Sequence, residues 1–125
     1  MELKTKLYLV DEEGNKFMGI GVLWLLQHIR IHKSLRKGSS VLGISYSKAF
    51  GMIRNLEKSL GVAILDRKKG GANRDGATLT PFGEHFIELY ETFEQEAKRT
   101  LDKPYEEFRE KLSLLFEEDE DHGGL

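Results

Sequence analysis

A chain of 125 residues with 39% apolar residues is long enough for one domain with a modest core and an appendage. The absence of cysteine excludes disulfides, thiolate zinc sites and a cysteine nucleophile, and it suits a cytoplasmic location. The apolar run at residues 20–26 is too short to cross a bilayer, and the N-terminus lacks a signal-peptide pattern. We therefore expect a cytoplasmic protein with no membrane partner.

The net charge of -2 conceals a strong asymmetry along the chain. Residues 1–25 carry three basic and four acidic residues, residues 26–76 carry eleven and three, and residues 77–125 carry five and fourteen. A basic segment joined to an acidic one is typical of a nucleic-acid-binding core with an extension that avoids phosphates. Two solvated faces of opposite sign would give the same counts, so charge alone leaves both interpretations open.

The N-terminal part of the chain predicts a hairpin and then a helix. Residues 3–10 are rich in Leu, Tyr and Val, and turn-forming residues follow at 11–15, which together indicate a β-hairpin. A first helix is predicted over residues 19–32, because large apolar residues recur there at helical spacing. Its core-facing residues are Leu23, Leu25, Leu26 and Ile29.

Two further helices are predicted with a short turn between them. Ser34 is a suitable N-cap for a helix over residues 35–42, and Gly43 can end that helix in a left-handed conformation. Ser45 would cap the next helix, which reaches about Leu60. Two helices joined by so short a turn form a helix-turn-helix.

The third helix separates an apolar face from a basic one. Its core-facing residues are Ala49, Met52, Ile53, Leu56 and Leu60. The opposite stripe holds no acid, which suits a helix that enters the major groove, and Arg54 could pair there with guanine or phosphate. The candidate DNA-binding residues of this helix and its cap are Ser45, Tyr46, Ser47, Lys48, Gly51, Arg54 and Lys58. The alternative is an ordinary solvated face.

A second hairpin is predicted directly after this helix. Residues 62–65 and 77–79 have strand character, and residues 68–76 form a basic, glycine-containing loop between them. Such a hairpin is a wing, which can lie along a minor groove or a phosphate run, although a flexible hairpin tip is the alternative. The candidate DNA-binding residues of the wing are Arg67, Lys68, Lys69, Asn73 and Arg74.

A long helix is predicted from Pro81, capped by Thr80, to about Leu101, where residues 102–104 break it. An amphipathic helix follows, and residues 117–121 form an acidic tail. The long helix carries an apolar stripe with mostly coiled-coil spacing, which favours dimerisation over packing within one chain. The candidate dimer residues are Phe82, Phe86, Leu89, Phe93, Ala97 and Leu101.

A family resemblance rests on the order of several motifs. They are Gly43-Ile44-Ser45-Tyr46, Ala49-Phe50, Ile53, Leu56, Leu65, Arg67, Gly70-Gly71, Gly76-Ala77, Leu79-Thr80-Pro81 and Gly83. With these motifs the chain resembles the N-terminal DNA-binding domain of ModE-type molybdate-responsive regulators, and residues 60–83 also look like the related LysR-type winged helix. The resemblance implies a homodimer whose two recognition helices read a palindromic operator. Full-length members continue into a molybdate-binding module where this chain has a short helix and an acidic tail, so no molybdate site is expected within this chain.

The sequence therefore predicts a mostly α fold with small β elements, a winged helix-turn-helix with an N-terminal β-hairpin and a long C-terminal dimerisation helix. The expected domains are residues 1–101 for DNA binding and dimerisation, and residues 102–125 for the short helix and tail. The predicted function is sequence-specific binding of double-stranded DNA by a homodimeric transcription regulator. The alternatives are a protein-interaction module and a non-specific architectural DNA-binding protein.

No enzyme, cofactor or metal site is expected. His28 and His32 lie four residues apart on one predicted helix, as in some metal pairs, but no H-E-x-x-H pattern or acidic third ligand accompanies them. The chain also shows no arrangement of nucleophile and base and no cofactor fingerprint.

Overall fold

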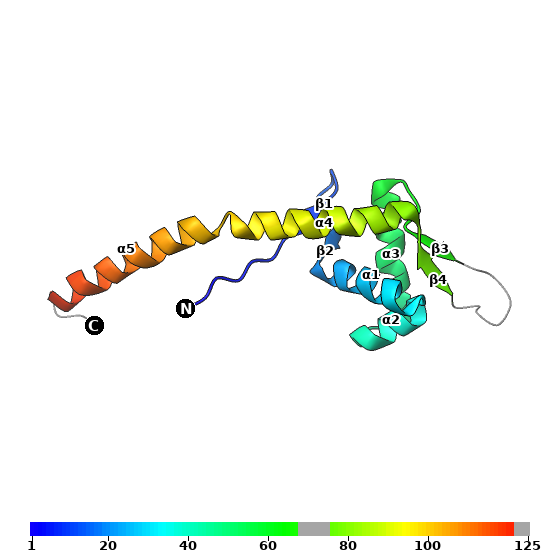
Figure 1. Ribbon diagram of the computed structural model, residues 1–125, viewed down its shortest axis with the longest axis horizontal. Helices are drawn as coiled ribbons and strands as arrows, with labels where there is room; N and C mark the ends of the chain where they lie inside the picture. The colour runs from blue at the N-terminus through cyan, green and yellow to red at the C-terminus, as the bar shows by residue number, and fades with distance from the viewer. Residues whose placement is uncertain (68–75, 122–125) are drawn as a thin grey trace. The chain divides into compact units, whose positions relative to one another are not determined.

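The computed structural model describes residues 1–67 and 76–121, with side chains described as far as Asp119. The chain forms two compact units, Lys6–Glu91 on the one hand and Met1–Thr5 with Thr92–Leu125 on the other. Within the described ranges there are five α-helices and two short antiparallel hairpins (Figure 1). The mostly helical fold with small β elements is therefore the one predicted from the sequence.

The N-terminal hairpin is present but shorter than predicted. Strand β1 (Tyr8–Val10) pairs antiparallel with β2 (Lys16–Gly19). Residues 3–7, which have the same apolar character, lie outside the strand. The reason is that β2 ends at Gly19, opposite Tyr8, so no partner backbone continues the ladder beyond that pair.

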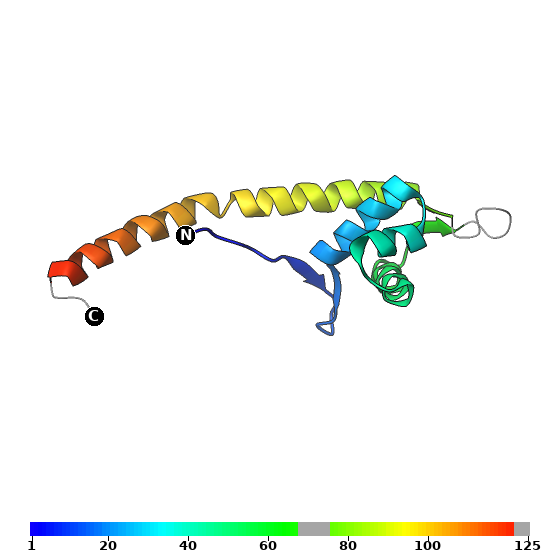
Figure 2. The same ribbon diagram turned by 90° about the horizontal axis from the view of Figure 1, so that it is seen from below.

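Three helices form the body of the unit Lys6–Glu91. They are α1 (Ile20–His32), α2 (Leu35–Leu42) and α3 (Tyr46–Leu60), as predicted to within one residue. The predicted caps explain this agreement, because Ser34 Oγ accepts the Lys37 N–H at 3.0 Å and begins α2 where expected. Figure 2 shows α3 nearly end-on, with α1 and α2 beside it.

The core of this unit draws side chains from both hairpins and four helices. The largest fully buried side chains are Met18, Leu25, Leu26, Ile29, Ile53, Leu56, Ile64 and Ile87. Each such burial contributes about 1.5–3 kcal/mol, so these contacts fix α3 against α1. Ile87 belongs to no stripe that the sequence singled out. The buried residues of α1 and α3 are the predicted ones, except that Val22 of α1 is buried as well.

The second hairpin pairs β3 (Leu65–Arg67) antiparallel with β4 (Ala77–Leu79). The predicted strand at residues 62–65 is therefore wrong except for its last residue. The backbone N–H groups of the last two residues in that range donate to Glu57 Oε2, at 2.8 and 3.3 Å. Leu65 nevertheless pairs with Leu79, the last residue of β4. Because Thr80 caps α4 and Pro81 begins it, no partner strand remains for residues 62–64.

Helix α4 (Pro81–Arg99) begins at the predicted cap, where Thr80 Oγ1 accepts the Gly83 N–H at 3.0 Å. Within the unit Lys6–Glu91 its buried residues are Gly83, Ile87 and Tyr90. These residues dock the start of α4 on the core, and the apolar stripe predicted for dimerisation lies beside them on the same helix.

Helix α5 (Asp102–Asp121) belongs to the second unit and corrects two predictions. The predicted break is present but lies at residues 100–101 instead of 102–104, because α4 already ends at Arg99 and Pro104 lies in the first turn of α5. Proline is tolerated there, since the first N–H groups of a helix have no intrahelical partner. The acidic residues 117–121 continue α5 and are not a separate tail.

Candidate nucleic-acid interface

The turn between α2 and α3 is built by three residues. Gly43 adopts φ +72°, the left-handed conformation that favours glycine, and its N–H donates to the Ser40 carbonyl at 3.1 Å. The Ile44 N–H donates to the Ser39 carbonyl at 3.0 Å, while its side chain packs partly buried against the core. Ser45 then caps α3 by accepting a backbone N–H at 3.1 Å. These bonds fix the direction in which α3 leaves α2.

Helix α3 presents one buried and one exposed face, as predicted. Ala49, Ile53 and Leu56 are buried, and Met52 and Leu60 are partly buried at the edges of that face. All candidate DNA-binding residues of the helix and its cap are exposed, namely Ser45, Tyr46, Ser47, Lys48, Gly51, Arg54 and Lys58. This set contains no carboxylate, so nothing in it would repel a phosphate.

Gly51 lies in the middle of α3 without a packing reason. An added Cβ would meet nothing within 4 Å. Glycine inside a helix costs about 0.5–1 kcal/mol relative to alanine, so this position gives up stability that its own fold does not require. A small residue on an exposed helix face instead suits the close approach of another molecule.

The carboxylate of Glu57 in α3 does not join the basic stripe. Its side chain is 21% exposed, and Oε2 accepts the two N–H groups before β3. Its Oε1 lies 3.9 Å from Arg67 Nη2, at the end of β3. Glu57 therefore fastens α3 to the first strand of the second hairpin.

Glu57→Gln is expected to lower the free energy of unfolding by about 1–2 kcal/mol, because hydrogen bonds to a charged acceptor are stronger than those to a neutral amide. Urea unfolding followed by circular dichroism measures this difference. Glu88→Gln, at an exposed position of α4, is the matched control and should leave stability nearly unchanged. Equal stability of the Glu57 and Glu88 variants would show that the negative charge adds nothing to the two backbone hydrogen bonds.

The base of the second hairpin is anchored beside the turn between α1 and α2. The Ala77 N–H donates to the Lys33 carbonyl at 3.0 Å, and Ser34 forms an isolated bridge with Gly76. Arg67 is exposed at the end of β3. The other candidate wing residues lie outside the described residues; they are Lys68, Lys69, Asn73 and Arg74.

Two residues that the sequence did not indicate as DNA-binding candidates, Arg36 and Phe50, lie close to residues that it did indicate. The guanidinium carbon of Arg36 lies 4.6 Å from the centroid of the Tyr46 ring, and the Tyr46 and Phe50 rings stack at 6.2 Å. The guanidinium carbons of Arg54 and Arg67 lie 5.8 and 4.8 Å from the Phe50 centroid. One signal was available, since Tyr46, Phe50 and Arg54 recur every four residues and so share one row of a helix.

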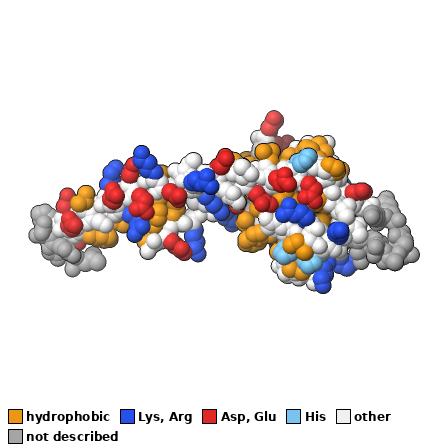
Figure 3. Space-filling view, viewed as in Figure 1, with side chains coloured by type: hydrophobic (Ala, Val, Ile, Leu, Met, Phe, Trp, Pro, Cys, Tyr) orange, Lys and Arg blue, Asp and Glu red, His pale blue; other side chains and the backbone are white. Residues whose placement is uncertain are grey.

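The charge asymmetry of the sequence is also a separation in space. Within the unit Lys6–Glu91, acidic side chains gather over α4 and basic ones along the lower edge around α2 (Figure 3). Two of the acids face a cation, because Arg30 of α1 lies 3.8 Å from Glu84 and 3.7 Å from Glu91. The helix-turn-helix therefore lies at the basic side of this unit.

The candidate dimer residues differ in exposure, and one of them, Leu101, lies beyond the end of α4. Phe82, Leu89 and Phe93 are 41%, 71% and 47% exposed, whereas Phe86 packs partly buried against the core. Ala97 and Leu101 have intermediate exposure in the second unit. Packing within the chain thus accounts for Phe86 but leaves Leu89 largely in solvent.

The histidine pair of α1 is a ring stack. The rings of His28 and His32 lie 5.8 Å apart and nearly parallel, at an angle of 7°. Among the residues that the structure describes, no group of three or more His, Cys, Asp or Glu side chains is placed to hold a metal ion. None of the described helices combines the length and low polarity that crossing a bilayer requires.

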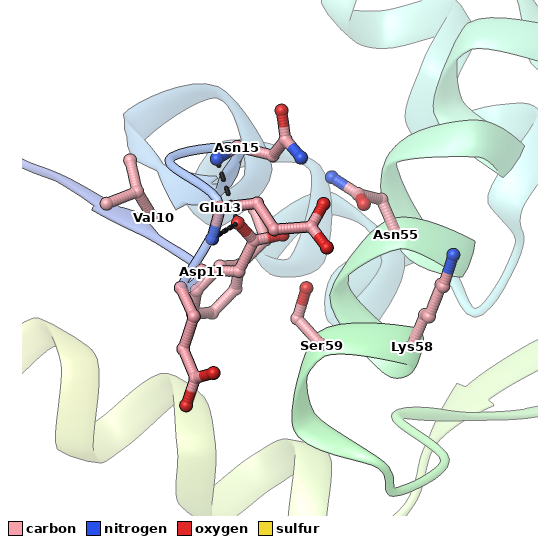
Figure 4. Close-up of a pocket in the computed structure, with 9 residues that line it drawn as sticks. Val10, Asp11, Glu13, Asn15, Asn55, Lys58 and Ser59 are labelled. Carbon is pink, nitrogen blue, oxygen red and sulfur yellow. Dashed lines mark hydrogen bonds between the residues drawn. The ribbon is translucent and has the colours of Figure 1, made fainter.

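A cavity of about 630 Å³ lies between the β1–β2 turn and the C-terminal half of α3 (Figure 4). Asp11 Oδ1 accepts the N–H groups of Glu13 and Asn15, each at 2.9 Å. Asn55 of α3 donates to the Lys16 carbonyl of β2 at 3.0 Å. These polar groups close the turn and tie the hairpin to α3.

The exposed helix after a tight turn, followed by a two-stranded hairpin, defines a winged helix-turn-helix. Residues 22–84, half of the chain, match the family model of the bacterial regulatory helix-turn-helix proteins of the lysR family. The chain belongs to this family, which confirms the predicted LysR-type, ModE-like DNA-binding domain of a transcription regulator. Membership also agrees with the prediction that the chain is not an enzyme.

Similar proteins of known function include ModE regulators. The chain is 32% identical over 78 residues to the DNA-binding transcriptional dual regulator ModE of Escherichia coli K12, and 35% over 80 residues to the transcriptional regulator ModE of Yersinia pestis. Each match covers 62% of this chain and 30% of the relative. The chain thus spans about 30% of the length of these relatives.

Solved structures of similar fold include two DNA-binding domains in complex with DNA. The CbnR domain has a TM-score of 0.56 at 23% identity, and the match covers 70% of this chain and 95% of that one. The BenM domain bound to benA site 1 DNA has a TM-score of 0.53 at 21% identity, with 71% and 94% covered. These likenesses confirm the winged helix-turn-helix fold.

Proposed function

We propose that two copies of this chain form a homodimer that binds a specific inverted repeat in double-stranded DNA and thereby regulates transcription. The observation that carries the proposal is the exposed, acid-free face of α3 in a chain of the lysR family. A helix that reads the major groove needs donors for base edges and phosphates, and Ser47, Lys48 and Arg54 supply them. At Gly51 the helix backbone can come close to the bases.

Dimerisation is supported by the apolar stripe of α4, in which Leu89 is 71% exposed. A second copy related by a twofold axis would cover these side chains with the same side chains of its own α4. Two recognition helices would then meet successive major-groove faces, about 34 Å apart. The proposal assigns no molybdate site to this chain. It places the protein in the cytoplasm, where a bacterial regulator meets its DNA.

The direct test uses purified protein and sheared genomic DNA at about physiological salt. Bound fragments are recovered and sequenced against the input. Enrichment of an inverted repeat is the expected result, and it would name the targets. Fragments without a common motif would point to an architectural DNA-binding protein, and no bound fragments to a protein-interaction module; either result overturns the proposal.

Arg54→Ala is expected to reduce discrimination at one base pair of each half-site by about 1–2 kcal/mol, since arginine reads guanine through paired donors. Lys48→Ala should instead weaken all sequences alike and flatten the salt dependence, because lysine near the start of the helix contacts phosphate. Fluorescence anisotropy on single-substituted sites, at several salt concentrations, separates the two effects. If Arg54→Ala keeps the full base preference, α3 does not lie in the groove as proposed.

A further inference from the structure

We propose that Phe50 is a positioning residue for DNA recognition, whose ring holds Arg54 of α3 and Arg67 of β3 in place for the nucleic acid. The inference rests on the proposed function of the α3 face. It goes beyond that function because it assigns a role to a residue that presents no hydrogen-bond donor of its own.

The position of Phe50 makes its ring a platform. Phe50 is partly buried and packs against the core, and this packing restrains its ring. The guanidinium carbons of Arg67 and Arg54 lie 4.8 and 5.8 Å from the ring centroid, within the range of cation–π attraction. The centroids of the Tyr46 and Phe50 rings are 6.2 Å apart, and the rings stack. The guanidinium carbon of Arg36 in α2 lies 4.6 Å from the Tyr46 centroid. Three arginines, one each from α2, α3 and β3, thus lie against the two neighbouring rings of Tyr46 and Phe50.

Holding an arginine on a ring prepares it for DNA. A free arginine side chain loses much rotamer freedom when it binds, and a side chain already held in its bound geometry loses less. A guanidinium has five N–H donors around its edge, whereas its flat faces carry none. Contact with an aromatic ring therefore leaves donors available for a phosphate or a guanine.

Arg67 has a second partner that links α3 to the hairpin. Glu57 Oε1 lies 3.9 Å from Arg67 Nη2, while Oε2 of the same carboxylate accepts the Ile64 and Leu65 N–H groups. Arg67 is thus set between a ring and a carboxylate that both belong to α3. This arrangement makes the arginine of β3 part of the same surface as Arg54.

The experiment compares three variants on the inverted repeat recovered by sequencing. Phe50→Leu should weaken binding about tenfold, because two cation–π contacts are lost. Phe50→Tyr keeps the ring and should bind within about threefold of the parent. Phe17→Leu is the matched control, since Phe17 is also partly buried against the core but lies on β2, and it should bind like the parent. Circular dichroism confirms that each variant is folded at the binding temperature.

A double-mutant cycle and NMR distinguish positioning from a merely structural role. Arg67→Ala should cost less affinity in the Phe50→Leu background than in the parent, because the two changes remove one interaction. In the free protein, Phe50→Leu should remove the ring-current shifts of the Arg54 and Arg67 side-chain protons. Parent-like affinity of Phe50→Leu, additive effects in the cycle or unchanged proton shifts would overturn the role of Phe50 alone. Failure of the parent protein to select a DNA site would overturn the proposed function itself, and this inference with it.

Discussion

Gly83→Ala is expected to lower the free energy of unfolding by about 2–3 kcal/mol, because the new methyl group has no room. A Cβ at this position would lie 2.6 Å from the Ile64 carbonyl oxygen and 3.3 Å from Ile64 Cγ2. The carbonyl cannot move away freely, since it accepts the Thr80 N–H at 2.9 Å and Ile64 itself is fully buried. The start of α4 must therefore shift from the core, which loosens the docking of Ile87. Urea unfolding followed by circular dichroism measures the loss.

Gly51→Ala is the matched control, because it makes the same chemical change inside another helix. No atom lies within 4 Å of the added methyl group, so only the helix preference remains. We expect an increase in stability of about 0.5–1 kcal/mol. If Gly83→Ala lowers the free energy of unfolding and Gly51→Ala raises it, the close packing of Gly83 against Ile64 is supported. A destabilisation at Gly83 no larger than the effect at Gly51 would contradict it.

The helices were predictable because their ends are marked by local signals. Ser34 and Ser45 each accept a backbone N–H three residues on, and Gly43 takes the left-handed conformation that ends α2. Such signals need only neighbouring residues, so they can be seen in the sequence. The apolar spacing of α1 and α3 is equally local, and the stripes that it predicted are buried, apart from Met52 and Leu60, which are partly buried.

The errors arose where contacts distant in sequence decide the structure. Residues 62–64 have strand character, but β4 ends at Leu79, opposite Leu65, and the chain then enters α4, so this stretch has no partner strand. Gly83 belongs to a motif that the sequence showed, but only the structure shows why a glycine is needed there, namely its contact with the Ile64 backbone. Pro104 was misinterpreted for a different reason. A proline breaks the middle of a helix but is tolerated in the first turn, and Pro104 lies in the first turn of α5.

The candidate site divides in the same way. The exposed face of α3 could be predicted from one helix, because its members are related by spacing alone. The ring contacts of Arg36 and Arg67 could not, since these residues come from α2 and β3 and meet the rings of α3 only in the folded chain. The sequence therefore indicated which residues bear charge, and the structure indicates which of them are held in place.

Leu89→Glu is expected to raise the dissociation constant of the proposed homodimer about a hundredfold or more. Leu89 is 71% exposed on α4, and burying a leucine side chain contributes about 1.5–3 kcal/mol. In a twofold dimer the change occurs on both copies, and each new carboxylate would have to leave water or face its mate across the axis. Sedimentation equilibrium over a range of concentrations measures the dissociation constant.

The matched control is Val41→Glu, which puts the same charge at an exposed apolar position of α2, outside the stripe. It should leave the dimer intact, although an acid near the helix-turn-helix would weaken DNA binding. Leu89→Glu should bind a single half-site like the parent but lose the added affinity for the inverted repeat, because two linked half-sites bind together only in a dimer. If Leu89→Glu sediments as a dimer with the dissociation constant of the parent, the apolar stripe of α4 is not the dimer contact.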